Sequence, residues 1–263
     1  MRTLHARVLL QGARTALSLP ARALSTTAAA AAAAPTARPS AQLLAQLKAA
    51  PAFCFDVDST VITTEGIDEL AAFAGRKAQV AALTAQAMGG SMPFERALEA
   101  RLRLIAPTRA LLAAFLAAHP PAFTPGLQAV VAALHARGAH VYLVSGGFTQ
   151  MIHPVAAALG VARERVFANT ILFEAAGEGA YAGFDASAPT SRDGGKAEVM
   201  RALKARHGYA PLVMVGDGAT DLQARAPGAA DVMLGYGGIA QREAVVKGAC
   251  WYFRDFAELQ PLL

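Results

Sequence analysis

Short apolar runs alternate with longer helical patterns from residue 52 to the C-terminus. Each run has about the length of a buried strand, and most runs end at a Gly or an Asp. The runs cover residues 52–57, 140–144, 212–215, 231–234 and 251–253. Helical patterns at residues 127–137, 149–159, 196–207 and 239–247 separate them. This alternation predicts an α/β fold with a Rossmann-like parallel sheet core flanked by helices.

One connection is too long for a simple crossover between strands. Residues 61–125 contain no strand pattern, only helical patterns at 67–74, 78–87, 94–105 and 109–118. We therefore expect an inserted helical cap after the first strand, at residues 63–125, on a core formed by residues 41–62 and 126–263. A second irregular segment, residues 166–184, alternates polar and apolar positions around Gly177 and Gly179, which predicts a small β-hairpin.

The first forty residues differ in composition from the rest of the chain. They are rich in Arg, Ser, Thr and Ala, and the first acidic residue is Asp56. Basic and apolar residues at 4–10 and 14–19 can segregate onto opposite helical faces, which is typical of an organelle transit peptide. Composition does not separate chloroplast from mitochondrion cleanly, and of the two we favour the chloroplast. A disordered Ala-rich tail without a targeting role is the alternative, and residues 1–40 are excluded from the fold prediction.

The excess of positive charge also lies near the N-terminus. The first fifty residues hold six Arg and Lys, and removing these from the formal net charge of +5 leaves −1 for the remainder. That remainder has no basic stripe interleaved with aromatic residues, which argues against nucleic-acid binding. The longest membrane-span candidate, the Ala run at residues 28–34, is too short and too weakly apolar to cross a bilayer.

The two cysteines, Cys54 and Cys250, both have apolar neighbours, so we expect both to be core residues. A disulfide between them is disfavoured by the expected intracellular compartment. With no other Cys and with scattered His residues, a thiolate zinc site is not available.

Polar residues suited to phosphate chemistry follow three of the predicted strands. Ligands of an open parallel sheet bind beyond the carboxyl ends of its strands. Those ends carry Asp56, Asp58, Ser145, Gly146, Gly147, Asp217, Thr220 and Asp221, and Lys196 begins a helix between the last two of these strands. We expect three of these carboxylates, a hydroxyl and the lysine to converge on one crevice.

The charges of this set indicate its chemistry. Carboxylates packed together repel one another unless a cation lies among them. Oxygen ligands without His or Cys select a hard ion, and Mg²⁺ is the usual one with phosphate. That ion and Lys196 would neutralise the repulsion between an anionic nucleophile and an anionic phosphate, while Ser145 and the following Gly amides offer donors. Asp56 could then attack phosphorus, with Asp58 as acid and base.

Each feature alone has an ordinary structural explanation. A carboxylate pair in a loop is more often a turn or a helix cap, Ser145 could cap the following helix, and Lys196 alone would be a solvated lysine. Their joint occurrence in order, each at a strand end or a helix start, favours the catalytic interpretation.

Longer motifs extend the pattern. Residues 55–61 (FDVDSTV) and 65–70 (EGIDEL) closely resemble the phosphoserine phosphatase family of the haloacid-dehalogenase superfamily. So do residues 87–90, 93–94, 101–102, 144–148, 181–184 and 216–221. The resemblance runs from about residue 50 to the C-terminus and includes cap segments. The differences are the N-terminal extension, a slightly longer hairpin at 174–179 and scattered cap positions at 76–80.

The resemblance implies roles for the core residues. Asp56 would be the nucleophile and Asp58 the acid/base. Mg²⁺ would be held by Asp56, the backbone carbonyl of Asp58, and Asp217. The remaining core residues would contact phosphate or support it: Ser145, Gly146 and Lys196 bind phosphate, Asp221 orients Lys196, and Thr220 lies near the substrate.

The resemblance also implies roles in the cap. Glu65 would receive the substrate ammonium and Arg101 its carboxylate, while Met88 and Gly89 would line the pocket. A fork-shaped guanidinium suits a carboxylate because it can bind both oxygens. Without the resemblance, Glu65 and Arg101 would be interpreted as surface charges on cap helices.

The implied activity is Mg²⁺-dependent hydrolysis of O-phosphoserine to serine and phosphate through an aspartyl phosphate, the last step of phosphorylated serine biosynthesis. The alternative is a related phosphatase or phosphotransferase acting on another small phosphomonoester, such as phosphohomoserine. A catalytically dead phospho-ligand sensor is opposed by the intact acidic and lysine residues. A dinucleotide-binding enzyme is disfavoured because no Gly-x-Gly-x-x-Gly turn follows the first strand. Family members are often dimeric, and the sequence leaves a homodimer open.

Overall fold

The computed structural model describes residues 38–88 and 92–263. The predicted transit peptide falls almost wholly on residues 1–37 and the predicted pocket residue Gly89 falls on 89–91, so both lie outside the described residues. Within the described ranges, no helix combines the length and the apolar character needed to cross a membrane.

Six parallel strands form the central sheet in the order β3-β2-β1-β6-β7-β8, which confirms the predicted fold class. In chain order they are β1 (Ala52–Phe55), β2 (His140–Phe148), β3 (Val166–Asn169), β6 (Leu212–Gly216), β7 (Val232–Tyr236) and β8 (Trp251–Phe253). The register places Phe55 of β1 between Leu143 of β2 and Val215 of β6. The carboxyl ends of these three strands therefore lie at one edge.

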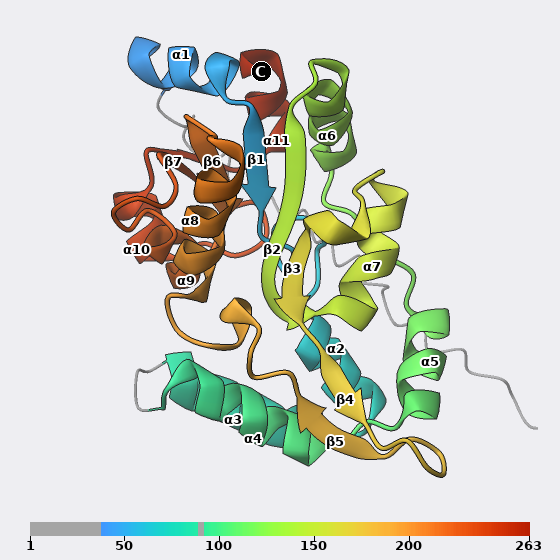
Figure 1. Ribbon diagram of the computed structural model, residues 1–263. Coiled ribbons are helices and arrows are strands. Elements are labelled where there is room, and N and C mark those ends of the chain that lie inside the picture. The colour runs from blue at the N-terminus through green and yellow to red at the C-terminus, as the bar shows by residue number, and fades with distance from the viewer. Residues whose placement is uncertain (1–37, 89–91) are drawn as a thin grey trace, which may run out of the picture. The chain divides into compact units, whose positions relative to one another are not determined.

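Helices cover both faces of the sheet (Figure 1). One layer contains α1 (Ala41–Ala49), α6 (Leu127–Ala136), α7 (Thr149–Ala158) and α11 (Phe256–Leu259). The other contains α8 (Gly195–His207), α9 (Ala219–Gln223) and α10 (Glu243–Gly248). Because side chains alternate along a strand, Phe53 and Phe55 of β1 enter the first layer and Cys54 enters the second. Burial on both faces explains why the strands are continuous apolar runs.

Four helices lie between β1 and α6: α2 (Gly66–Phe73), α3 (Lys77–Met88), α4 (Phe94–Ile105) and α5 (Arg109–Ala118). They share a separate apolar cluster that includes Leu70, Leu102 and Phe115. A two-stranded hairpin, β4 (Ile171–Phe173) and β5 (Tyr181–Phe184), packs on the same cluster. Figure 1 shows α3, α4 and the hairpin grouped beyond the carboxyl ends of β1 and β2.

The predicted hairpin at 166–184 was wrong in its first residues. β3 joins the central sheet parallel to β2, and only β4 and β5 form the antiparallel pair. Thr170 alone separates β3 from β4, so no turn signal marks the change of sheet. β2 also continues beyond the predicted 140–144, because Phe148 pairs with Asn169 of β3.

The expectation for the cysteines is half correct. Cys54 is buried in β1, whereas Cys250 is exposed, so its prediction as a core residue was wrong. The alternation of β8 sends Trp251 and Phe253 into the core. Cys250 immediately precedes them and falls on the opposite side, although its amide donates to the Met233 carbonyl.

Candidate active site

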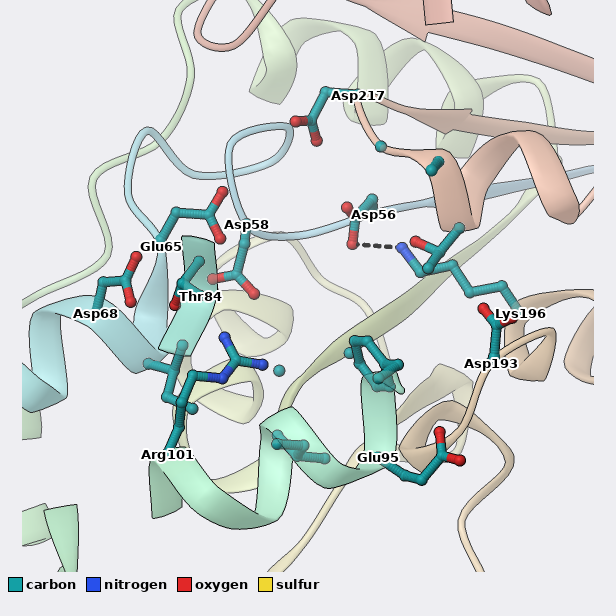
Figure 2. A pocket seen from close by; sticks show the side chains of 18 of the residues that line it. Asp56, Asp58, Glu65, Asp68, Thr84, Glu95, Arg101, Asp193, Lys196 and Asp217 are labelled. Carbon is teal, nitrogen blue, oxygen red and sulfur yellow. Dashed lines mark ion pairs between the residues drawn. The ribbon is translucent and has the colours of Figure 1, made fainter. Parts of the chain in front are cut away.

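Acidic side chains and one lysine meet beyond the carboxyl ends of β1 and β6. Asp56 follows β1, and its amide donates to the Val215 carbonyl at 2.9 Å, which holds it at the sheet edge. Lys196, in the first turn of α8, places Nζ 2.8 Å from Asp56 Oδ1 and 2.6 Å from Asp221 Oδ1. Figure 2 shows the Asp56–Lys196 ion pair in the pocket.

Two glycines allow this close packing. A Cβ on Gly195 would lie 1.8 Å from the Pro189 carbonyl oxygen, so only glycine lets α8 begin here. A Cβ on Gly216 would lie 2.2 Å from Cγ of Asp221, which therefore needs glycine at the end of β6. Lys196 and Asp221 are brought together by backbone positions that no larger residue can occupy.

The Lys196 ammonium is almost fully buried, with 5% of the residue exposed. Burial alone would lower the pKa of Lys196, but the carboxylates of Asp221 and Asp56 raise it above the usual lysine range. Lys196 therefore carries its charge at neutral pH. A buried charge of this kind is stable only because it is paired.

Asp217, at the end of β6, is 2% exposed and has two polar partners. The Thr60 hydroxyl donates to its Oδ1 at 2.9 Å, and the guanidinium of Arg242 forms an ion pair with its Oδ2. Arg242 also lies 3.9 Å from Glu65 Oε1, so it links the two acids. Sequence reasoning missed Arg242 because it stands well beyond the end of β7, outside any strand-end motif.

The acidic residues fit a hard metal ion. Asp56, Asp217 and Asp221 each offer a carboxylate oxygen within 4.8 Å of the others. Carboxylate oxygens without His or Cys are the donors that Mg²⁺ and similar ions prefer. All three carboxylates also have protein partners: Asp221 contacts Lys196 and the Gly218 amide, Asp217 contacts Thr60 and Arg242, and Asp56 contacts Lys196.

Asp58 lies two residues after Asp56, and its carboxyl group is close to Gly66 and Gly147. Its Oδ1 accepts a hydrogen bond from the Gly66 amide at 2.7 Å. A Cβ on Gly147 would lie 2.9 Å from its Oδ2. Burial, reinforced by the negative charges of Glu65 and Asp56, raises the pKa of Asp58 to about 7. A carboxyl group with this pKa can both donate and accept a proton near neutral pH.

The loop after β1 turns sharply to bring Glu65 over the site. Ser59 adopts a left-handed backbone conformation with φ 54°, and its hydroxyl donates to Glu65 Oε1 at 2.7 Å. Burial raises the pKa of Glu65, while the Ser59 hydrogen bond lowers it. On α4, Arg101 is half-buried, and burial lowers its pKa against the opposing effect of Asp68, Glu65 and Asp58.

One cavity of about 840 Å³ brings most of the predicted residues together. Its lining includes Asp56, Asp58, Glu65, Arg101, Gly146, Lys196, Asp217 and Thr220. Ser145 and Asp221 are buried behind this surface, and Ser145 Oγ accepts from the Gly147 amide at 2.9 Å. Met88 ends α3, but its side chain lies outside the described part of the chain, as does Gly89.

Comparison with known proteins identifies the class. The chain belongs to the haloacid dehalogenase-like hydrolase family, whose model matches residues 53–225. It is 49% identical to the chloroplastic phosphoserine phosphatase of Arabidopsis thaliana, over 84% of this chain and 74% of that protein. It is also 49% identical to the phosphoserine phosphatase of Mus musculus, over 80% of this chain and 92% of that protein. Within the hydrolases, the chain therefore belongs to the phosphoserine phosphatase family.

A solved structure agrees with the sequence comparison. The phospho-aspartyl intermediate analogue of phosphoserine phosphatase superposes with a TM-score of 0.68 and 25% identity. The match covers 81% of this chain and 99% of that one.

Proposed function

We propose that the protein hydrolyses O-phosphoserine to serine and phosphate through an aspartyl phosphate on Asp56. The observation that carries this proposal is the composition of one cavity. Asp56, Lys196 and Asp58 lie at its sheet edge, and Glu65 and Arg101 lie on its cap side. The first group suits phosphoryl transfer, and the second offers opposite charges to a substrate that carries both an ammonium and a carboxylate.

The first chemical step forms the covalent intermediate. Lys196 and the Val57 amide both contact Asp56 Oδ1, so Oδ2 is the oxygen that attacks phosphorus. As the Asp56–phosphorus bond forms, the bond from phosphorus to the serine oxygen breaks. Protonated Asp58 gives its proton to that oxygen, and serine leaves as a neutral alcohol.

The second step reverses the role of Asp58. Its carboxylate, held by the Gly66 amide, removes a proton from a water molecule whose oxygen attacks phosphorus. The bond between Asp56 and phosphorus breaks, and inorganic phosphate leaves. Lys196 stabilises the phosphoryl oxygens in both steps, with Asp221 fixing the direction of its ammonium.

We assign metal binding to Asp56, Asp217 and the backbone carbonyl of Asp58. Mg²⁺ bound there would neutralise negative charge on the nucleophile and the phosphate. Asp221 serves as a support for Lys196. Ser145, Gly146 and Thr220 contact the phosphate side of the substrate, while Met88 and Gly89 belong to the cap side of the pocket.

Further assignments rest on the sequence and the relatives. We propose that residues 63–125 are a cap on a core of residues 41–62 and 126–263, that residues 1–40 are an organelle transit peptide, and that the organelle is a chloroplast. The reaction would then complete a phosphorylated route to serine. A homodimer is compatible with the sequence and is left open.

Phosphate release by the full chain tests the activity. Phosphoserine, phosphohomoserine and p-nitrophenyl phosphate are compared with Mg²⁺ and with EDTA, each with and without an alcohol acceptor. We expect phosphoserine to be the preferred substrate, and chelation to abolish turnover. Preference for phosphohomoserine, or transfer to the acceptor, would select the alternative activity.

Asp56→Asn serves as the inactive control. Loss of the nucleophilic oxygen should remove turnover by at least about a thousandfold while the far-UV circular dichroism spectrum stays the same. Undiminished turnover in this variant would refute the covalent mechanism, whereas phosphate release by the wild type excludes a catalytically dead sensor.

A further inference from the structure

Asp68 has a buried carboxylate oxygen whose partner is not accounted for. It lies in the first turn of α2, and its Oδ1 accepts no hydrogen bond from any residue that the structure describes. Leaving a buried acceptor unsatisfied costs on the order of 1–3 kcal/mol, and more for a charged group. Such atoms in native proteins generally have a ligand or a functional reason.

Arg101 has the complementary surplus of donors. Its Nε donates to the Ala97 carbonyl one turn earlier on α4, at 3.1 Å. No ion pair engages its two terminal nitrogens within residues 38–88 and 92–263. A guanidinium presents five N–H donors in a planar fork, so one edge can bind a protein carboxylate while the other binds a ligand.

These two side chains face the same cavity from different helices. Asp68 on α2 and Arg101 on α4 both line the 840 Å³ space. In Figure 2 the Arg101 guanidinium lies below Asp58 and Thr84, and Asp68 lies to their left, beside Glu65 and Thr84. Of these three acids, Asp68 has the largest electrostatic effect on the guanidinium.

Thr84 of α3 adds a second buried group without a partner. Its hydroxyl Oγ1 is buried, lines the same cavity and forms no hydrogen bond to a described residue. Figure 2 places Thr84 in the part of the pocket that holds Asp68 and Arg101. A hydroxyl can donate to a carboxylate and accept from a guanidinium, so it suits a position between these two groups.

We infer that Asp68, assisted by Thr84, is a positioning residue that aims the Arg101 guanidinium at the substrate carboxylate. This inference rests on the proposed function and adds a determinant of its specificity. In this role Asp68 engages one edge of Arg101, and the other edge is left for two parallel hydrogen bonds to the ligand. Fixing the fork in advance reduces the entropy that binding would otherwise lose.

The competing role for Asp68 is direct binding of the substrate ammonium beside Glu65. The two roles differ in which part of the substrate they require. Positioning through Arg101 matters only when the substrate has a carboxylate. Direct ammonium binding matters for any aminoalkyl phosphate, including phosphoethanolamine, which lacks the carboxylate.

A double-mutant cycle separates these roles. Asp68→Asn, Arg101→Ala and the double variant are assayed with phosphoserine, phosphoethanolamine and p-nitrophenyl phosphate. Glu69→Gln is the matched control, because it neutralises the next acid on α2, which does not line this cavity. Thr84→Val provides a second perturbation that leaves all charges in place.

For phosphoserine we expect Asp68→Asn to raise KM about tenfold with kcat changed less than about threefold. In the Arg101→Ala background the same change should have almost no further effect, because its partner is already gone. Thr84→Val should raise KM for phosphoserine in the same direction, and Glu69→Gln should leave it unchanged. Activity on the other two substrates should be unaffected by Asp68→Asn.

Three results would overturn the inference. Additive effects of Asp68→Asn and Arg101→Ala would show that the residues act independently. A raised KM for phosphoethanolamine would assign Asp68 to the ammonium. An unchanged KM for phosphoserine would leave Asp68 without a role in binding. Failure of the wild type to hydrolyse phosphoserine would instead refute the proposed function, and the two failures are thereby distinguished.

Discussion

Replacing Lys196 by Met should expose how strongly the buried charges of the site depend on one another. Met keeps the unbranched apolar stem of the side chain, one atom shorter, but removes the ammonium that contacts both Asp56 and Asp221. The Asp221 side chain is fully buried and that of Asp56 is 12% exposed, so neither carboxylate gains enough solvent to compensate. Breaking a buried pair by removing one partner costs about 3–5 kcal/mol.

The free energy of unfolding that Lys196→Met loses should depend on pH. Burial already raises the pKa of the Asp221 carboxyl in the folded state above its unfolded value of about 3.9, and the Lys196 ammonium opposes that shift, so removing the ammonium raises the pKa further. A group with a raised folded pKa contributes stability that is present at low pH and lost as the pH rises through that pKa. The variant should therefore be closer to wild type at about pH 5 than at about pH 8.

Urea-induced unfolding measures this free energy directly. The chain has a single Trp, Trp251 in β8, whose fluorescence reports the core, and EDTA prevents a bound ion from replacing the lost charge. Lys204→Met is the control on the same helix. Its ion pair with Asp231 is 24% and 32% exposed, so its removal should cost only about 0–1 kcal/mol.

The reasoning fails if Lys196→Met is no less stable than Lys204→Met, or if its deficit is the same at both pH values. Either outcome would mean that the carboxylates are neutral or solvated in the folded protein. The ammonium would then be dispensable for the fold, and its importance would be limited to binding phosphate.

Two further predictions concern the cysteines and Gly147. A thiol reagent such as DTNB should modify exposed Cys250 rapidly in the native protein and Cys54 only after unfolding. Burial raises the pKa of Cys54 and blocks access of the reagent. Two thiols that react at equal rates in the native protein would contradict this. Gly147→Ala should lower kcat roughly 10- to 100-fold with little change in KM or melting temperature. The Cβ of the new alanine would displace the Asp58 carboxyl. Full activity in steady-state assays would show that Asp58 tolerates the shift.

The sequence predicted those elements whose signal is local and strong. The helices at 94–105 and 109–118 match α4 and α5 in both bounds, since apolar periodicity and flanking Pro or Thr define their ends. β8 was likewise placed to the residue. β3 was not predicted as such because Thr170 alone separates it from β4, and α9 was not because a five-residue helix carries little periodicity of its own.

The same distinction holds for the candidate site. Strand-end positions predicted Asp56 and Asp217 at one edge, because parallel topology brings those ends together whatever the details of packing, and the Gly-Gly-Lys helix start between the strands added Lys196. Arg242 and Asp68 could not be found in this way. Each is a charged residue at or near a helix start, and only the packing of the helices shows that it faces the cavity rather than solvent.

The attachment of the inserted helices to the core links the position of Asp58 to that of Glu65. The segments that enter and leave the insert pair with each other, through a bridge between Ile62 and Phe123 and backbone hydrogen bonds from Thr63 and Thr124. Asp58 lies just before this root and Glu65 just after it. The Ser59 hydroxyl, next to Asp58 in the chain, donates to Glu65, and the Gly66 amide, next to Glu65, donates to Asp58. A displacement of the insert about its root would therefore act on both acids at once, so the position of Asp58 is tied to that of Glu65.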